Sequence, residues 1–239
     1  MNSRFPGFSR DAIAFLRALK RNNRREWFQP RKDKYESLIK LPLMELVGCI
    51  NEELARFAPA YVTPPQKGVY RIYRDTRFSK DKTPYKTYIS AIFPRNTAVK
   101  REGAVFYFHF TERELLIFGG VYSPARDELL AYRTLLRERY QEFNDILAGK
   151  KLRRAFGGLQ GEQLTRMPKG FLVDHPAEGL LRHRQWFLES TVNSKILLSP
   201  KVVQEIASRF DLMAPFVEFL NQPFAHKRAK QNRTMFAMF

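Results

Sequence analysis

The densest group of side chains capable of chemistry lies in residues 71–93, RIYRDTRFSKDKTPYKTYISAIF. The first sixteen of these residues carry six cations and two carboxylates. The cations are Arg71, Arg74, Arg77, Lys80, Lys82 and Lys86, and the carboxylates are Asp75 and Asp81. Guanidinium groups hold phosphate and carboxylate through paired hydrogen bonds. Because two carboxylates cannot neutralise six cations, this stretch predicts a site that prefers anions.

Two interpretations of these charges stay open at the level of the sequence. In the first, a phosphate- or carboxylate-bearing ligand is bound by Arg71, Arg74, Arg77, Lys82 and Lys86. In the second, Asp75 and Asp81 tie the arginines into a structural clamp, and no ligand is involved. Burying several cations together is costly unless each is paired or solvated, so both interpretations place Asp75 close to an arginine.

Candidates for proton transfer are few. Within the stretch, Asp75 or Tyr85 would move a proton if a reaction occurs. Elsewhere, Asp174 and His175 adjoin in sequence, but neighbouring side chains in an extended chain point to opposite sides. Pro176 favours a turn there, with Asp174 capping a helix that begins near Ala177. The sequence does not decide whether the protein is an enzyme.

Metal and cofactor chemistry finds little support in the motifs. The four histidines, His109, His175, His183 and His226, lack metal-ligand spacing, and His109 in FYFHF is interpreted as a core residue. None of the common NTPase, zinc-protease, hydrolase or dinucleotide motifs occurs. We therefore expect no metal site and no cofactor.

The overall charge points to polyanionic partners. With 42 Lys and Arg against 24 Asp and Glu, the formal net charge is +18. Such a balance favours nucleic acid or phosphorylated molecules. A nucleic-acid-binding module that uses the basic surface is therefore an alternative function, and a scaffold contacting an acidic protein is a third. One cysteine, no signal peptide and no long apolar run predict a cytoplasmic protein without a membrane span.

Two further segments allow more than one interpretation. NNRREW, residues 22–27, is either part of the anion site or a helix corner with capping asparagines, and capping is favoured. FGG, residues 118–120, either brings backbone close to a ligand or marks a strand end or bulge, and the second is favoured.

The hydrophobic periodicity supplies the elements that position these residues. Ser9 is the expected N-cap of the first helix, and a second helix runs from Pro42 to Phe57. Strands are expected over 69–74, 85–93, 104–110 and 115–122, after a loop over 63–68 and around a ten-residue loop over 75–84. Helices follow from Ser123 to Leu147 and over 150–158. Residues 186–193 fit a strand or a helix, and a final helix over 199–222 should break at Pro215.

These elements predict an α+β fold, a single domain with a mainly antiparallel sheet flanked by N-terminal and C-terminal helices. The domain should span residues 1–225. Residues 226–239 form a basic C-terminal tail that offers little apolar surface to bury. The oligomeric state does not follow from the sequence.

The stretch over 71–93 resembles the signature of a large family of uncharacterised bacterial and fungal proteins with a domain of unknown function. Three other segments fit the same family: residues 21–36, 118–124 and 167–187. The resemblance extends from about Phe15 to Phe219, and Val121 departs from it where a small residue is expected. It implies one domain over most of the chain and implies no activity, substrate or catalytic residue.

Overall fold

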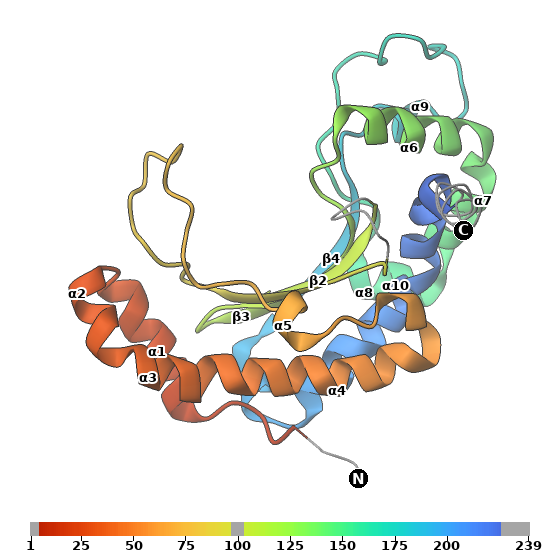
Figure 1. Cartoon of the computed structure of the whole chain (residues 1–239). Coiled ribbons are helices and arrows are strands. Elements are labelled where there is room, and N and C mark those ends of the chain that lie inside the picture. The colour runs from red at the N-terminus through yellow and green to blue at the C-terminus, as the bar shows by residue number, and fades with distance from the viewer. Residues whose placement is uncertain (1–4, 97–102, 226–239) are drawn as a thin grey trace, which may run out of the picture. The chain divides into compact units, whose positions relative to one another are not determined.

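A computed structural model describes residues 5–96 and 103–225. The fold is α+β, as predicted, with an antiparallel sheet of four strands in the order β1-β2-β3-β4 (Figure 1). The strands are β1 (Ile89–Pro94), β2 (Val105–Phe110), β3 (Glu114–Val121) and β4 (Trp186–Asn193). Residues 186–193, which fit either element by sequence, therefore form a strand.

The described residues group into two compact units. The first comprises residues up to Phe93 together with Tyr107–Ile117 and Thr191–Arg209. The second comprises Pro94–Phe106, Phe118–Ser190 and the residues from Phe210 onward. A single domain over 1–225 stays a prediction, and the expected basic tail over 226–239 lies outside the described residues.

The helices of the first unit begin with α1 (Arg10–Arg21), where the Ser9 hydroxyl accepts the Ala12 N–H at 3.1 Å, confirming the predicted cap. The short helices α2 (Arg25–Phe28) and α3 (Lys32–Tyr35) follow, separated by the 3₁₀ turn Gln29–Arg31. A π-helical turn, Glu36–Lys40, leads into α4 (Leu41–Phe57). Pro42 occupies the first turn of α4, directly after this π-helical turn, where the chain is already helical.

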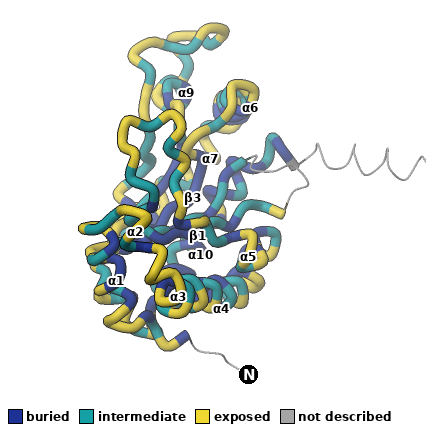
Figure 2. Tube along the Cα trace, turned by 60° about the vertical axis from the view of Figure 1, so that its left-hand side comes forward, coloured by how far each residue is buried: buried dark blue, intermediate teal, exposed yellow. Residues whose placement is uncertain are grey.

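Aromatic and aliphatic side chains form the core of this unit. From α4, Leu43, Leu46 and Ile50 are fully buried, and Figure 1 shows α4 running beneath the strand residues. From β2, the Phe110 ring lies 4.8 Å from that of Phe8. Buried residues, dark blue in Figure 2, gather along the strands. The apolar spacing of the sequence thus matches the buried side of α4.

Residues 69–74 do not form the predicted strand. They make isolated antiparallel bridges, Val69 with Ala91 and Tyr73 with Tyr85. Between these two bridges the chain advances four residues from Val69 to Tyr73, but six from Tyr85 to Ala91. The second stretch therefore has two extra residues, which form a bulge. This bulge interrupts the ladder, and β1 begins at Ile89 instead of Tyr85. Residues 63–68, predicted as a loop, contain the single helical turn α5 (Pro65–Gly68).

The second unit contains α6 (Arg126–Glu138), α7 (Tyr140–Ala148), α8 (Lys150–Phe156), α9 (Glu178–Leu181) and most of α10 (Lys201–Ala225). As predicted, α8 ends at a glycine, Gly157, with φ of 77°. Its core includes Phe143, whose ring lies 5.4 Å from Phe216 and 5.2 Å from Phe219.

Contrary to prediction, α10 continues through Pro215. Proline in a helix interior removes one hydrogen bond and crowds the preceding turn. Here Pro215 is exposed, while Met213, Phe216 and Val217 are fully buried. Burial of these neighbours offsets the cost of the proline, a compensation that local propensity does not reveal.

The glycines of FGG lie within β3 of the second unit. A Cβ at Gly119 would meet the Met213 sulfur at 2.8 Å, and one at Gly120 would meet the Trp186 carbonyl oxygen at 2.3 Å. Gly120 also has φ of 134°. Close packing against α10 and β4 accounts for both glycines.

Candidate functional site

The 71–93 stretch, here called the signature, lies in the first unit and is held there by residues of the N-terminal helices. The Asn23 amide donates to the Tyr85 carbonyl at 2.8 Å and accepts the Tyr85 N–H at 3.0 Å. The Phe28 ring stacks on that of Tyr85, with centroids 4.2 Å apart. NNRREW therefore contacts the signature directly.

The neighbouring Asn22 has the other role considered for this segment. Its side-chain amide donates to the Ala18 carbonyl at 2.9 Å, and its backbone N–H also reaches Ala18, at 3.0 Å. These bonds satisfy the end of α1. The two hypotheses for NNRREW thus apply to different asparagines.

A hydrogen-bonded clamp closes the signature loop, residues 75–84. The Arg74 guanidinium bonds Asp81 at 2.5 Å, the Thr83 hydroxyl, and the Ser79 hydroxyl at 3.4 Å. Asp81 also accepts the Thr83 N–H at 2.9 Å. That backbone bond, followed by the bonds from Arg74 and the Thr83 hydroxyl, lowers the pKa of Asp81 to about 2. Asp81 is therefore ionised at neutral pH and accepts hydrogen bonds from Arg74 and Thr83.

A second pair lies further along the loop. The Arg77 guanidinium bonds both oxygens of Asp75, at 3.0 Å and 2.7 Å. The side-chain and backbone bonds from Arg77 lower the pKa of Asp75 to about 2. The expected proximity of Asp75 to an arginine is thus present, although the Arg77 side chain is 77% exposed. A carboxylate engaged in this way is a poor proton acceptor.

Three cations of the signature make no ion pair with any described residue: Arg71, Lys80 and Lys82. All three are exposed. Lys82 donates to the Thr76 carbonyl at 2.9 Å, which fixes its ammonium group over the loop. Both acids of the signature are already bonded to arginines, so the loop carries surplus positive charge.

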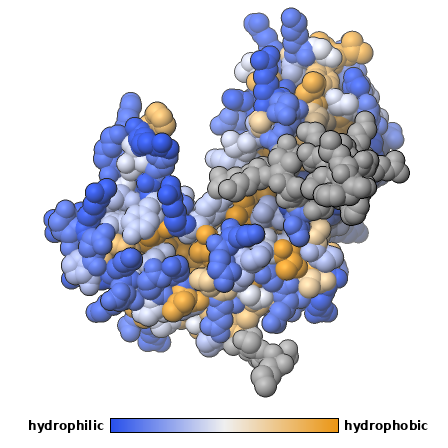
Figure 3. All heavy atoms as spheres, in the orientation of Figure 1, coloured by the Kyte–Doolittle hydropathy of each residue, from blue (hydrophilic) through white to orange (hydrophobic). Residues whose placement is uncertain are grey.

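An aromatic side chain lies among these charges. Phe78 is 94% exposed, and the Arg77 guanidinium carbon lies 5.7 Å from its ring centre. The loop projects on the side of the strands away from α4 (Figure 1). Figure 3 shows hydrophobic atoms at its tip among hydrophilic ones.

Lys86, which follows the loop, lies beside a group of rings here called the aromatic face. Its members are Tyr70, Tyr88, Tyr107 and His109. The Lys86 ammonium lies 4.8 Å from the Tyr70 ring centre and 5.9 Å from that of Tyr88. Ring centroids are 5.1 Å apart for Tyr88 and His109, 5.7 Å for Tyr107 and His109, and 6.3 Å for Tyr70 and Tyr107. A lysine over tyrosine rings is a favourable cation–π arrangement.

His109 is only partly buried, contrary to the core role expected for it. Along β2 the phenylalanines are buried, whereas Tyr107 and His109 alternate with them on the opposite side. Burial lowers the pKa of His109, although the charge of Glu114 opposes this shift. Burial likewise raises the pKa of Tyr107. Both rings are therefore neutral near pH 7 and suited to stacking and hydrogen bonding.

The aromatic face was not predicted from the sequence, although alternation in FYFHF carried a signal. Every second residue of that segment is a phenylalanine, so the remaining tyrosine and histidine share the other side. Tyr88 lies in the bulged stretch directly before β1, where no local pattern assigns it a side. The bulge brings it within reach of His109.

The catalytic candidates belong to different units. Tyr85 is 1% exposed, and burial raises the pKa of its hydroxyl. Asp174 and His175 belong to the second unit, whereas Asp75 belongs to the first. Asp174 does not cap α9, which has no side-chain cap; the His175 Nδ1 accepts the Ala177 N–H at 3.0 Å in the turn before the helix.

Comparison with known proteins now adds one finding. A model of the conserved hypothetical protein family DUF2461 matches residues 11–219. The chain belongs to this family. No curated protein and no solved structure matches it. The family match agrees with the resemblance drawn from the signature and extends across both compact units.

The described residues carry neither a membrane-spanning helix nor a group of metal ligands. None of their helices is both long and apolar enough to span a bilayer. Over the same residues, no three His, Cys, Asp or Glu side chains are grouped so that they could hold a metal ion.

Proposed function

We propose that the signature loop binds the phosphate or carboxylate group of an anionic ligand. The observation that carries this proposal is that the two aspartates of the loop pair with only two of its cations. Asp75 and Asp81 are each bonded to one arginine, while Arg71 and Lys82 make no ion pair with a described carboxylate, and Arg71 acts on Asp75 only through its charge. Surplus cations on an ordered loop attract anions.

The cations of the proposed site divide into two roles. Arg74 and Arg77 organise the loop through their aspartates and offer their remaining N–H groups to the ligand. Arg71 and Lys82 supply uncompensated charge, and Lys86 supplies an ammonium group held over tyrosine rings. The bound group would replace water around these cations.

The test is calorimetric titration with inorganic phosphate, tripolyphosphate and citrate. We expect binding of at least one anion, and Arg71→Ala with Lys82→Ala should weaken it at least roughly tenfold, since each lost bond to a charged group costs about 1.5–3 kcal/mol. The matched control is Lys151→Ala with Arg154→Ala on α8, which removes the same charge from exposed positions of the other unit. Equal weakening by both pairs, or no binding to the wild type, contradicts the proposal.

A nucleic-acid-binding function is the second candidate, and Phe78 is the observation that favours it. Exposed aromatic rings beside cations stack on bases of single strands. Fluorescence anisotropy with single- and double-stranded oligonucleotides at two salt concentrations tests it. Phe78→Ala should weaken single-strand binding by about 1–3 kcal/mol, whereas Leu172→Ala, another exposed apolar residue at 79%, should not. Absence of binding at low salt eliminates this candidate.

A structural clamp within an interaction scaffold is the third candidate, favoured by the Arg74 bonds to Asp81 and Thr83. It predicts that Arg74→Ala lowers the melting temperature, and that none of the tested anions or oligonucleotides raises the melting temperature of the wild type. A ligand-induced rise would favour the anion-binding proposal instead.

A further inference from the structure

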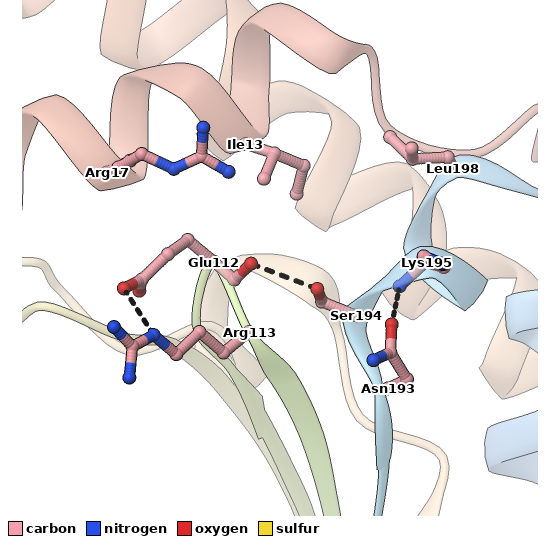
Figure 4. A pocket seen from close by; sticks show the side chains of 8 residues that line it. All are labelled: Ile13, Arg17, Glu112, Arg113, Asn193, Ser194, Lys195 and Leu198. Carbon is pink, nitrogen blue, oxygen red and sulfur yellow. Dashed lines mark hydrogen bonds and ion pairs between the residues drawn. The ribbon is translucent and has the colours of Figure 1, made fainter.

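A cavity of about 390 Å³ lies in the first unit, away from the residues of the signature. Its lining comes from α1, from the turn between β2 and β3, and from the 3₁₀ helix Ser194–Leu198 after β4. Figure 4 shows Arg17 and Ile13 of α1 on one side and Glu112 and Ser194 on the other. A second hollow of about 500 Å³ shares Ile13, Arg17, Lys195 and Leu198 with it, so the two adjoin.

Positive charge without a partner lines this cavity. Arg17 and Lys195 are exposed and make no ion pair with a described residue. Arg10, which lines the adjoining hollow, makes none either. Arg10 and Arg17 are two turns apart on α1 and therefore share a face of the helix. Arg17 and Lys195 thus offer cations without ion-pair partners at two places along the lining.

Glu112 provides a buried hydrogen-bond acceptor that lacks a donor. Its side chain is only 7% exposed; Lys20 bonds its Oε1 at 3.0 Å, and the Arg113 Nε lies 3.6 Å from the same oxygen. The other oxygen, Oε2, is buried and has no hydrogen-bond partner among the described residues. An unsatisfied buried acceptor costs about 1–3 kcal/mol, so a donor at this position would be stabilising.

The ionisation state of Glu112 decides what that donor must be. Burial would raise its pKa, but the hydrogen bond and charge of Lys20, with the charge of Arg113, outweigh burial and lower the pKa. The group is therefore a carboxylate near neutral pH and can only accept hydrogen bonds. The terminal torsion of a glutamate side chain is soft, so a small turn of the carboxylate would let the unsatisfied Oε2 meet a donor in the cavity.

From this arrangement we propose that the cavity binds a small carboxylate that has an apolar body and an N–H or O–H donor beside its carboxyl group. The carboxyl group would bind Arg17 and Lys195, the donor would bond Glu112, and the apolar body would lie against Ile13 and Leu198. Amino acids and hydroxy acids with branched aliphatic side chains share this chemistry. The cavity volume is within the range of small-molecule sites.

Four probes separate the parts of this proposal: leucine, its hydroxy-acid analogue leucate, isocaproate, which lacks the donor, and isoamylamine, which lacks the carboxyl group. Calorimetry or ligand-detected NMR on the full chain should show leucine or leucate binding at least roughly tenfold tighter than isocaproate and isoamylamine. Preference for leucine identifies an amino acid, and preference for leucate a hydroxy acid. Isocaproate binding as tightly as both, or no binding by any probe, overturns the proposal.

Variants assign the contacts. Arg17→Gln, at an exposed position, should weaken leucine or leucate binding at least roughly tenfold without lowering the melting temperature. Glu112→Gln should reduce the preference over isocaproate, and if this variant does not fold, Arg17→Gln and Lys195→Gln still decide the outcome. The paired substitution Arg71→Ala and Lys82→Ala should leave leucine and leucate binding unchanged. If this substitution weakens anion binding to the signature loop but leaves leucine and leucate binding intact, the two sites are distinct.

Discussion

At the scale of single residues, three asparagines connect segments that no strand ladder joins. Each side-chain amide both donates to and accepts from the backbone of one distant residue. The pairs are Asn23 with Tyr85, Asn51 with Thr63, and Asn221 with Ala104. The carboxamide group resembles a peptide unit, so it satisfies one N–H and one carbonyl where regular pairing stops.

The Asn23 pair is the one that positions the signature, which leads to a prediction. Asn23→Ala removes two bonds and leaves the partly buried Tyr85 backbone groups unsatisfied. We expect a loss of about 1–3 kcal/mol in the free energy of unfolding, measured by denaturant titration. Asn22→Ala, which removes one side-chain bond at the end of α1, should cost less. An equal cost for both would mean that the Tyr85 bonds contribute little.

Arg74 and Arg77 carry the same group and both bond an aspartate, yet their burial differs. The Arg74 side chain is 25% exposed and bonds several loop groups, whereas Arg77 is 77% exposed. Arg74→Ala should therefore cost roughly 1–3 kcal/mol of unfolding free energy, and Arg77→Ala should cost less, because a solvent-exposed ion pair contributes little to stability. Thermal and denaturant unfolding measure both. A larger cost for Arg77→Ala would contradict the assignment of Arg74 as the clamp.

At the scale of elements, the signature loop depends on its two ionised aspartates, so its order should depend on pH. The pKa of Asp81 is about 2 in the folded chain, below its ordinary value of 3.8. A depressed pKa means that the stabilisation is complete above pH 4 and is lost as the pH falls through about 2. An NMR titration should show the Thr83 amide signal moving over that range. In Asp81→Asn the titration should vanish, and a midpoint near 4 in the wild type would refute the depressed pKa.

Gly120 in β3 and Gly157, directly after α8, allow a matched comparison of what a side chain costs at each position. A Cβ at Gly120 would lie 2.3 Å from the Trp186 carbonyl oxygen, whereas one at Gly157 meets nothing within 4 Å, and both glycines have positive φ. Gly157→Ala should cost about 1–2 kcal/mol from backbone strain alone. Gly120→Ala should cost distinctly more, because β3 or β4 must shift. Equal losses in denaturant unfolding would show that the strands move apart easily.

At the scale of the whole molecule, a net charge of +18 would attract any polyanion, and salt dependence shows how locally it acts. If the signature loop is the contact, Arg71→Ala with Lys82→Ala should reduce the slope of log affinity against log salt for single-stranded DNA by roughly 1–2. Lys151→Ala with Arg154→Ala should leave the slope unchanged. The same reduction in both variants would indicate diffuse attraction to the basic surface.

Much of the fold could be predicted from the sequence because the relevant physics is local. The Ser9 cap, the apolar stripe of α4, the glycine after α8 and the alternation in β2 each depend on residues within one or two turns or a single strand. The excess of cations over carboxylates in the signature is also a property of composition. These features needed no knowledge of distant neighbours.

The tertiary structure decided what depends on distant partners. Burial of neighbouring side chains carried α10 through Pro215, and the bulge before β1 broke the ladder expected for residues 69–74. Asn23 meets Tyr85, and Lys20 meets Glu112, across 62 and 92 positions of the chain. Propensity and periodicity describe a residue's own segment. Long-range burial and hydrogen bonding decide which other segment packs against it. The aromatic face and the Glu112 cavity both depend on such long-range packing.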